Sequence, residues 1–114
     1  MEATRQKLLF ICSRNQWRSP TAEALFKGSE TYDARSAGTS PQARTRVSEA
    51  HIRWADRIFV MEKRHRQLLL GRFGGDLRGK AVTVLDIPDE FQFMDPDLIE
   101  LLRARLSTQL EGIE

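Results

Sequence analysis

Three short apolar runs, separated by segments of helical periodicity, constrain the fold of this 114-residue chain more than any other feature. The runs are Lys7 to Ile11, Arg57 to Met61 and Ala81 to Leu85. Each has the length of a strand, and each is apolar along nearly its whole length. Strands of this kind are buried on both faces, as in parallel sheets. A fourth strand, Tyr32 to Ser36, is expected before the turn-forming residues 37–41.

The segments between these strands predict four helices. The first is expected from Pro20 to Gly28, the third from Glu62 to Leu70 with its end at Gly71, and the last from Asp95-Pro96 onward. The second should place Val47, Ala50, His51 and Trp54 on one face, and the last Leu98, Ile99, Leu102, Leu106 and Leu110. This alternation predicts an α/β fold over residues 1–114. We expect one three-layer, doubly wound domain, with a four-stranded parallel sheet covered by helices on both faces.

The single cysteine, Cys12, directly follows the first apolar run, and Arg18 lies six residues later. A thiol and a guanidinium at the two ends of a short loop suit a cysteine nucleophile that attacks a phosphate ester. The backbone N–H groups between them can form an anion-binding nest, and the planar fork of Arg18 can bind two phosphate oxygens. The expected phosphate-binding residues are Ser13, Arg14, Asn15, Gln16, Trp17, Arg18 and Ser19.

Ser19 and Pro20 predict where the next helix begins. Ser19 suits the N-cap and could donate its hydroxyl to the Cys12 sulfur, and Pro20 suits the first helical position. The positive end of that helix would favour an anion in the loop, including the attacking thiolate. A lone cysteine after an apolar strand is most often an inert core thiol, so the functional interpretation depends on Arg18 and the helix start.

Composition excludes several kinds of partner. No apolar run approaches the ~20 residues of a membrane span, and there is no nucleic-acid-binding motif or cluster of metal ligands. We therefore expect no nucleic acid, membrane, metal or cofactor. The N-terminus has no signal-peptide pattern and one cysteine allows no internal disulfide, which predicts a cytoplasmic protein. Residues 1–85, which contain the expected anion site, carry 16 basic and 8 acidic residues, whereas residues 86–114 carry 2 and 8.

The segment from Cys12 to Pro20, followed by Thr21-Ala22-Glu23-Ala24, resembles the catalytic loop of the low-molecular-weight protein tyrosine phosphatases. Three further segments resemble the same family in the same order: Ser36 to Thr39, Ala55 to Glu62 and Ile87 to Asp89. The resemblance covers essentially the whole chain. It implies hydrolysis of phosphate monoesters, phosphotyrosine above all, through a phosphocysteine on Cys12. It also implies that Arg18 binds the phosphate and that Asp89 is the general acid.

Three positions depart from the family pattern. Arg14 replaces a glycine, Trp17 replaces a frequent second cysteine, and Asp89-Glu90-Phe91 replaces an Asp-Pro pair followed by aromatic residues. The chain is also shorter than the usual members. These departures concern substrate preference more than chemistry.

Several neighbouring residues have alternative roles. Asp86 could cap or orient the loop that carries Asp89, and Asp95 is expected to be a helix N-cap. Trp17 and Phe91 could form walls for an aromatic leaving group, although Phe91 could equally pack in the core. Of the two histidines, we expect His51 to pack on an apolar helix face and His65 to be solvated.

The expected partners are a phosphorylated protein or a small aryl phosphate, with inorganic phosphate as the product. One alternative is an arsenate reductase that uses an external thiol, because the relay cysteines of that chemistry are absent from the sequence. Another is a regulatory module that binds oxyanions without turnover. Simple binding would need neither a thiol nor an acid, so Cys12 and Asp89 favour the enzyme.

Overall fold

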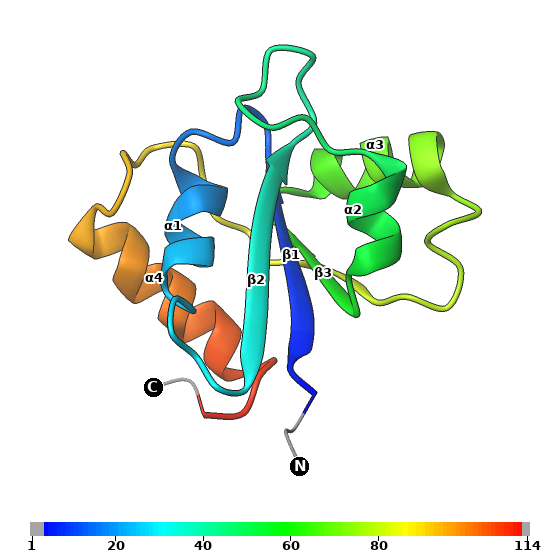
Figure 1. Cartoon of the computed structure of the whole chain (residues 1–114). Coiled ribbons are helices and arrows are strands. Elements are labelled where there is room, and N and C mark those ends of the chain that lie inside the picture. Colours follow the sequence, from blue (N-terminus) through cyan, green and yellow to red (C-terminus); the bar gives the residue numbers. More distant parts are fainter. Residues whose placement is uncertain (1–3, 113–114) are drawn as a thin grey trace.

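The computed structural model describes residues 4–112, in which strands and helices alternate. The strands are β1 (Gln6–Cys12), β2 (Tyr32–Gly38), β3 (Arg57–Val60) and β4 (Val82–Val84). The helices are α1 (Arg18–Ala24), α2 (Glu49–Trp54), α3 (Lys63–Phe73) and α4 (Pro96–Ser107). All strand pairs are parallel, in the order β2-β1-β3-β4. Helices α1 and α4 cover one face of the sheet and α2 and α3 the other, so the predicted fold class is confirmed (Figure 1).

The apolar run of β1 is buried because the sheet has a core on each side. Leu8, Phe10 and Cys12 point into the core under α1 and α4, whereas Leu9 and Ile11 point into the core under α2 and α3. This alternation is the period of two that a strand imposes. All five side chains are 3% exposed or less, which explains why the strand carries no polar face.

The boundaries of α1 differ from the prediction at both ends. The helix begins at Arg18, its N-cap is Trp17, and Pro20 is therefore its third residue. Ser19 is not the cap, because its hydroxyl contacts the Cys12 sulfur instead. Pro20 is tolerated there because the first four N–H groups of a helix have no acceptor within the helix. The regular helix ends at Ala24, and tighter turns then lead to Gly28, whose φ is +80°.

Two other helices also differ from the prediction. Helix α3 continues through Gly71 to Phe73, since Gly71 lies on the exposed side where nothing forces the chain to turn. The buried residues around α2 are Val47, Ile52 and Ala55, whereas Ala50 is exposed. The expected apolar face of α2 is correct only in part: Val47 is buried but precedes the helix, which begins at Glu49, and Trp54 packs partly against the core.

The loops that follow β1 and β2 are packed directly on one another. Thr39 N–H donates to the Cys12 carbonyl at 3.0 Å, and Arg44 N–H donates to the Arg14 carbonyl at 3.0 Å. A Cβ atom on Gly38 would lie 2.5 Å from the Ser13 carbonyl oxygen, so a side chain at this position would push the two loops apart. The loop that begins at Cys12 is thus supported from the side. Within residues 4–112 we find no helix with the length and apolarity needed to cross a membrane.

Candidate active site

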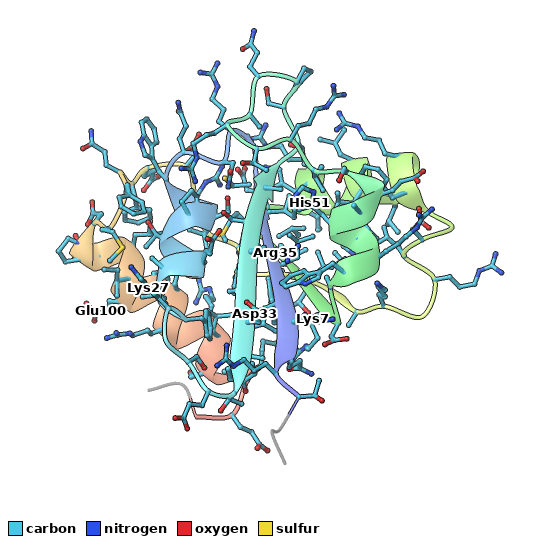
Figure 2. The ribbon with its side chains drawn as sticks, in the orientation of Figure 1. Lys7, Lys27, Asp33, Arg35, His51 and Glu100 are labelled. Atoms are coloured by element: carbon cyan, nitrogen blue, oxygen red, sulfur yellow. The ribbon has the colours of Figure 1, made fainter. Side chains whose placement is uncertain are left out.

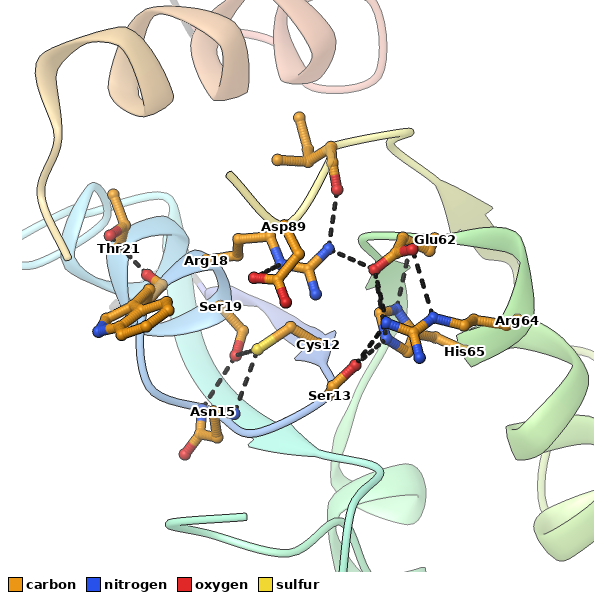
Figure 3. A network of polar contacts seen from close by, with 12 residues as sticks. Cys12, Ser13, Asn15, Arg18, Ser19, Thr21, Glu62, Arg64, His65 and Asp89 are labelled. Atoms are coloured by element: carbon orange, nitrogen blue, oxygen red, sulfur yellow. Dashed lines mark hydrogen bonds and ion pairs between the residues drawn. The ribbon is translucent and has the colours of Figure 1, made fainter. Parts of the chain in front are cut away.

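A small concave pocket lies beyond the carboxyl end of β1, where parallel α/β sheets bind their ligands. It is lined by Cys12, Ser13, Arg14, Gln16, Trp17, Arg18 and Asp89. The first six come from the end of β1, the loop after it and the first residue of α1, and the segment after β4 supplies Asp89. The structure therefore brings together seven of the expected site residues. Asn15 and Ser19 are buried beside the pocket and support it (Figure 3).

The sulfur of Cys12 is held by two polar contacts. Asn15 N–H donates to Sγ at 3.2 Å, and the Ser19 hydroxyl lies 2.9 Å from it. The Ser19 oxygen accepts from the side-chain amide of Asn15 at 3.0 Å, so its single hydrogen can point at the sulfur or at the more distant Ala37 carbonyl, 3.5 Å away. Both contacts can therefore donate to a negatively charged sulfur, and such donors stabilise a thiolate. The expected contact between Ser19 and Cys12 is present.

Asn15 holds the loop in its shape. Its φ is +56°, a left-handed conformation that asparagine tolerates better than most residues. Its buried amide also donates to Ser36 Oγ at 2.9 Å, and the Ser36 hydroxyl donates to the Glu23 carboxylate at 2.6 Å. These contacts link β2 and α1 to the loop. In the described part of the chain, the backbone N–H groups of Arg14, Gln16, Trp17 and Arg18 have no protein acceptor, as an anion-binding nest requires.

Arg18 is 2% exposed and anchored through one side of its guanidinium group. Its Nη1 donates to Glu62 Oε2 at 2.6 Å and to the Ile87 carbonyl at 2.8 Å. Its Nε lies 3.6 Å from Asp89 Oδ1, too far for a hydrogen bond but close enough for an ion pair. Nη2 and Nε therefore remain for an anion, and these two nitrogens form one edge of the planar fork.

Glu62 joins Arg18 to a second arginine. Its carboxylate also accepts from Arg64 Nη2 at 3.1 Å and from Arg64 Nε at 3.3 Å. Partial burial opposes ionisation of Glu62, but the hydrogen bonds from Arg64 and Arg18 outweigh this effect, and the pKa falls to about 2. Glu62 is thus an anion at neutral pH and fixes the orientation of both guanidinium groups.

His65 is fully buried, so the expectation that it is solvated was wrong. It lies in the first turn of α3, where its Nδ1 accepts from Glu62 N–H at 3.0 Å and its Nε2 lies 2.9 Å from Ser13 Oγ. Burial, followed by the charge of Arg18, lowers the pKa of His65 to about 4. The neutral ring must therefore carry its hydrogen on Nε2 and donate it to Ser13. The sequence showed only a histidine in a charged helix, and the first turn of α3 packs against the loop only in the tertiary structure.

Other expected residues lie at or near the site. Asp95 is the N-cap of α4, as predicted, and accepts from Asp97 N–H at 2.9 Å. Asp86 is exposed in a left-handed conformation, with φ of +59°. Phe91 packs partly against the core rather than lining the pocket, whereas Trp17 does line it. His51 is half-buried and caps α2 through Ser48, and burial, followed by Arg35, lowers its pKa.

Sequence reasoning missed the residues that fix Arg18 and Asn15. They are Glu62, the Ile87 carbonyl, Ser36 and Glu23. Glu62 could have been found from the rule that the carboxyl ends of parallel strands meet, because it follows the strand predicted at 57–61. Ser36 is likewise near the end of β2. Within residues 4–112 no three His, Cys, Asp or Glu side chains are grouped so that they could hold a metal ion.

Comparison with known proteins identifies the fold. No protein-family model matches the sequence, and no curated protein matches it. Among solved structures, the tyrosine phosphatase Wzb from Escherichia coli K30 in complex with phosphate has a TM-score of 0.75 and 22% identity, over 97% of this chain and 100% of that one. The YwlE arginine phosphatase from Geobacillus stearothermophilus has a TM-score of 0.71 and 22% identity, over 93% of both chains.

A third structure is a mutant of YwlE arginine phosphatase that carries a phosphorylated active-site serine. It has a TM-score of 0.67 and 25% identity, over 94% of this chain and 97% of that one. The expected structural resemblance is thereby confirmed across nearly the full length of the chain. This protein has the fold of the low-molecular-weight tyrosine phosphatases.

Proposed function

We propose that this protein hydrolyses phosphate monoesters through a phosphocysteine intermediate on Cys12. The observation that carries the proposal is the position of the Cys12 sulfur. It lies in the pocket that Arg18 and Asp89 also line, and it faces two hydrogen-bond donors. A nucleophile, a bidentate anion ligand and a carboxyl group are the groups that this reaction requires.

The reaction has two steps. The Cys12 thiolate attacks phosphorus, an S–P bond forms, and the bond to the leaving oxygen breaks as Asp89 gives that oxygen a proton. Water then attacks the phosphocysteine, Asp89 takes a proton from it, and inorganic phosphate and the thiolate are released. Arg18 and the loop N–H groups stabilise the equatorial oxygens in both steps. Binding of phosphate at Nε of Arg18 would compete with the contact to Asp89, which leaves Asp89 free for proton transfer.

Similar proteins support a phosphate-like ligand. The Wzb structure contains phosphate, and the YwlE mutant carries phosphate on its active-site serine. We propose that Ser13, Arg14, Asn15, Gln16, Trp17, Arg18 and Ser19 form the phosphate-binding loop. A phosphotyrosine protein or a small aryl phosphate is the substrate class that the residues at the pocket mouth fit, since Trp17 is an aromatic wall beside the phosphate site.

The test is hydrolysis of an aryl phosphate by the wild type and by Cys12→Ser and Arg18→Lys. Cys12→Ser should abolish turnover and keep affinity for inorganic phosphate, because the nest and Arg18 persist. Arg18→Lys should lower kcat by at least ~10²-fold, since an ammonium group cannot make the planar two-point contact. Rapid acid quench should trap a phosphoenzyme in the wild type during turnover, whereas any phosphoserine formed in Cys12→Ser, like that in the YwlE mutant, should not turn over.

Three results would overturn parts of this proposal. Unchanged turnover in Cys12→Ser would exclude Cys12 as the nucleophile. Phosphate binding without turnover in the wild type would show that the protein is a module that binds oxyanions and not an enzyme. Arsenate reduction with an added thiol, in the absence of aryl phosphate hydrolysis, would favour the reductase.

A further inference from the structure

A larger cleft of about 800 Å³ adjoins the Cys12 pocket. It extends between α1 and the outer edge of β2, and Phe26, Tyr32 and Ala34 contribute to its walls. Gln16 and Trp17 line both the cleft and the Cys12 pocket, so the two lie next to one another. We call this cleft the β2 groove. None of the proposed chemical steps uses it.

Apolar side chains are exposed where the groove meets the pocket. Trp17 is 43% exposed and Phe93 is 53% exposed, and both line the β2 groove. Met94 follows Phe93 and is 40% exposed. Large apolar side chains gathered at one place on a surface are typical of sites that bind another polypeptide.

The edge of β2 beside the groove has free backbone groups. Gln6 N–H donates to the Thr31 carbonyl, and Gln6 lies opposite Tyr32 in the parallel ladder. The backbone groups of odd-numbered residues of β2 therefore face β1, and those of even-numbered residues face outward. Gly38 follows this rule, because its N–H and C=O pair with residues 45 and 47 outside the sheet.

Ala34 and Ser36 are the even-numbered residues in the middle of this edge. Within residues 4–112 no hydrogen bond reaches their N–H or C=O groups. Figure 2 shows β2 as the foremost strand, with Asp33 and Arg35 along it and Lys27 beside α1. Ser36 is only 6% exposed and does not line the groove, whereas Ala34 is half-buried and lines it. The edge at Ala34 is therefore the part that can pair with an extended peptide.

The groove has a small excess of positive charge. Arg5, Lys27 and Arg44 line it against two carboxylates, Glu23 and Asp33. The Glu23 carboxylate already accepts a hydrogen bond from Ser36.

We propose that the β2 groove binds the polypeptide that flanks the phosphorylated residue of a protein substrate. The flanking segment pairs with the outward N–H and C=O groups of Ala34, and its apolar side chains contact Trp17 and Phe93. This inference rests on the proposed phosphatase activity of Cys12. Gly38 lies opposite Cys12, so Ala34 is four residues away, about 13 Å along the strand. Backbone pairing is therefore expected roughly three to five residues from the phosphorylated residue.

The test compares a phosphotyrosine peptide with a small aryl phosphate in Ala34→Pro and Ala34→Val. Proline removes the outward N–H without breaking the ladder to β1, and it is tolerated on edge strands. Valine is similar in size to proline and keeps the backbone N–H, so Ala34→Val is the matched control. Ala34→Pro should lower kcat/KM for the peptide about tenfold, the effect of one lost hydrogen bond, and leave kcat/KM for the small phosphate unchanged. Ala34→Val should leave kcat/KM for both substrates unchanged.

Two further measurements do not depend on the folding of the proline variant. N-methylation of peptide amides three to five residues from the phosphotyrosine should weaken hydrolysis by the wild type, and N-methylation at the far end of the peptide should not. Phe93→Ala should lower kcat/KM for the peptide alone. Leu68→Ala, which removes an exposed apolar side chain from α3, should leave kcat/KM for both substrates unchanged.

The outcomes separate this proposal from the phosphatase itself. Equal effects of Ala34→Pro on both substrates, or no effect of any N-methylation, would overturn peptide pairing and leave the phosphatase intact. If the wild type hydrolyses neither substrate, the phosphatase proposal fails. In that case, binding of a non-hydrolysable phosphonate peptide to the wild type and to Ala34→Pro would test the groove separately. Equal affinity of the two proteins would overturn the proposal that the groove binds the peptide.

Discussion

At the scale of single residues, Asp89 is the carboxylate best placed to transfer a proton. It lines the Cys12 pocket, whereas Asp86 is outside the lining and Asp95 is committed to the N-terminus of α4. Its side chain is 54% exposed and lies beside Arg18 Nε, so it can move when phosphate takes that nitrogen. The dependence of the rate on the leaving group can therefore show which of the three carboxylates is the general acid.

We expect Asp89→Ala to slow aryl phosphates with poor leaving groups far more than those with good ones. A proton is needed only when the departing oxygen is strongly basic, and general acids typically contribute ~10²–10⁴-fold. The measurement is kcat across a series of substituted phenyl phosphates, with Asp86→Ala as the control. If kcat depended steeply on the leaving group in Asp86→Ala but only weakly in Asp89→Ala, Asp86 rather than Asp89 would be the general acid. The basic limb of the pH–rate profile should also change only in the variant that lacks the acid.

At the scale of elements, the first turn of α3 fixes one side of the loop that follows Cys12. His65 connects the backbone of Glu62 to Ser13, and Glu62 holds Arg18 and Arg64. The Ser13 oxygen accepts from His65 Nε2 and from Arg64 Nη2 at 3.1 Å, which leaves its own hydrogen for another acceptor. Movement of α3 would therefore disturb both the loop and Arg18.

Burial of neutral His65 should make stability depend on pH. Its pKa is about 4 when folded and 6.5 ordinarily, so between these values the unfolded chain binds more protons. The free energy of unfolding should therefore rise as the pH rises from 4 to 6.5, by an amount of the order of 3 kcal/mol. Above pH 6.5 this contribution of His65 to stability should be complete. Urea unfolding at several pH values measures this rise. It should flatten in His65→Gln, whereas His51→Gln, at a half-exposed site, should keep most of it.

At the scale of the whole molecule, charge is divided unevenly along the chain. Residues 1–85 carry a net charge of +8 and residues 86–114 carry −6. Arg14 lines the Cys12 pocket, and Arg64 contacts Ser13 beside it. The site therefore has cationic side chains at and beside it, which can attract a phosphate dianion from solution.

We expect kcat/KM for an aryl phosphate to fall several-fold as ionic strength rises from about 0.01 to 0.15 M, because the Debye length shortens from about 30 to 8 Å. Arg14→Gln should reduce this dependence. Arg78→Gln removes the same charge from the connection that leads into β4, and it should leave the dependence unchanged. Equal salt slopes in the wild type and both variants would show that attraction by Arg14 does not assist substrate capture.

The sequence alone determined the features that depend on local pattern. Apolar runs of strand length indicated a parallel sheet within an α/β fold, although only β1 and β3 are fully enclosed and the three residues of β4, at the edge of the sheet, are half-buried. The spacing from Cys12 to Arg18 and the Ser-Pro pair also placed the loop before a helix, although the helix begins two residues earlier than expected. Helix ends were less predictable, because Gly71 breaks a helix only where packing lets the chain turn.

Only the tertiary structure decided how the site is held together. Arg18 is fixed by Glu62 and Ile87, which are 44 and 69 residues away in the sequence. His65 is buried because α3 packs beside the Cys12 loop, and no local pattern around it indicates this contact. The physical reason is that hydrogen-bond partners depend on which strand ends adjoin. The order β2-β1-β3-β4 places β2 and β3 on either side of β1, so their final residues meet at Cys12.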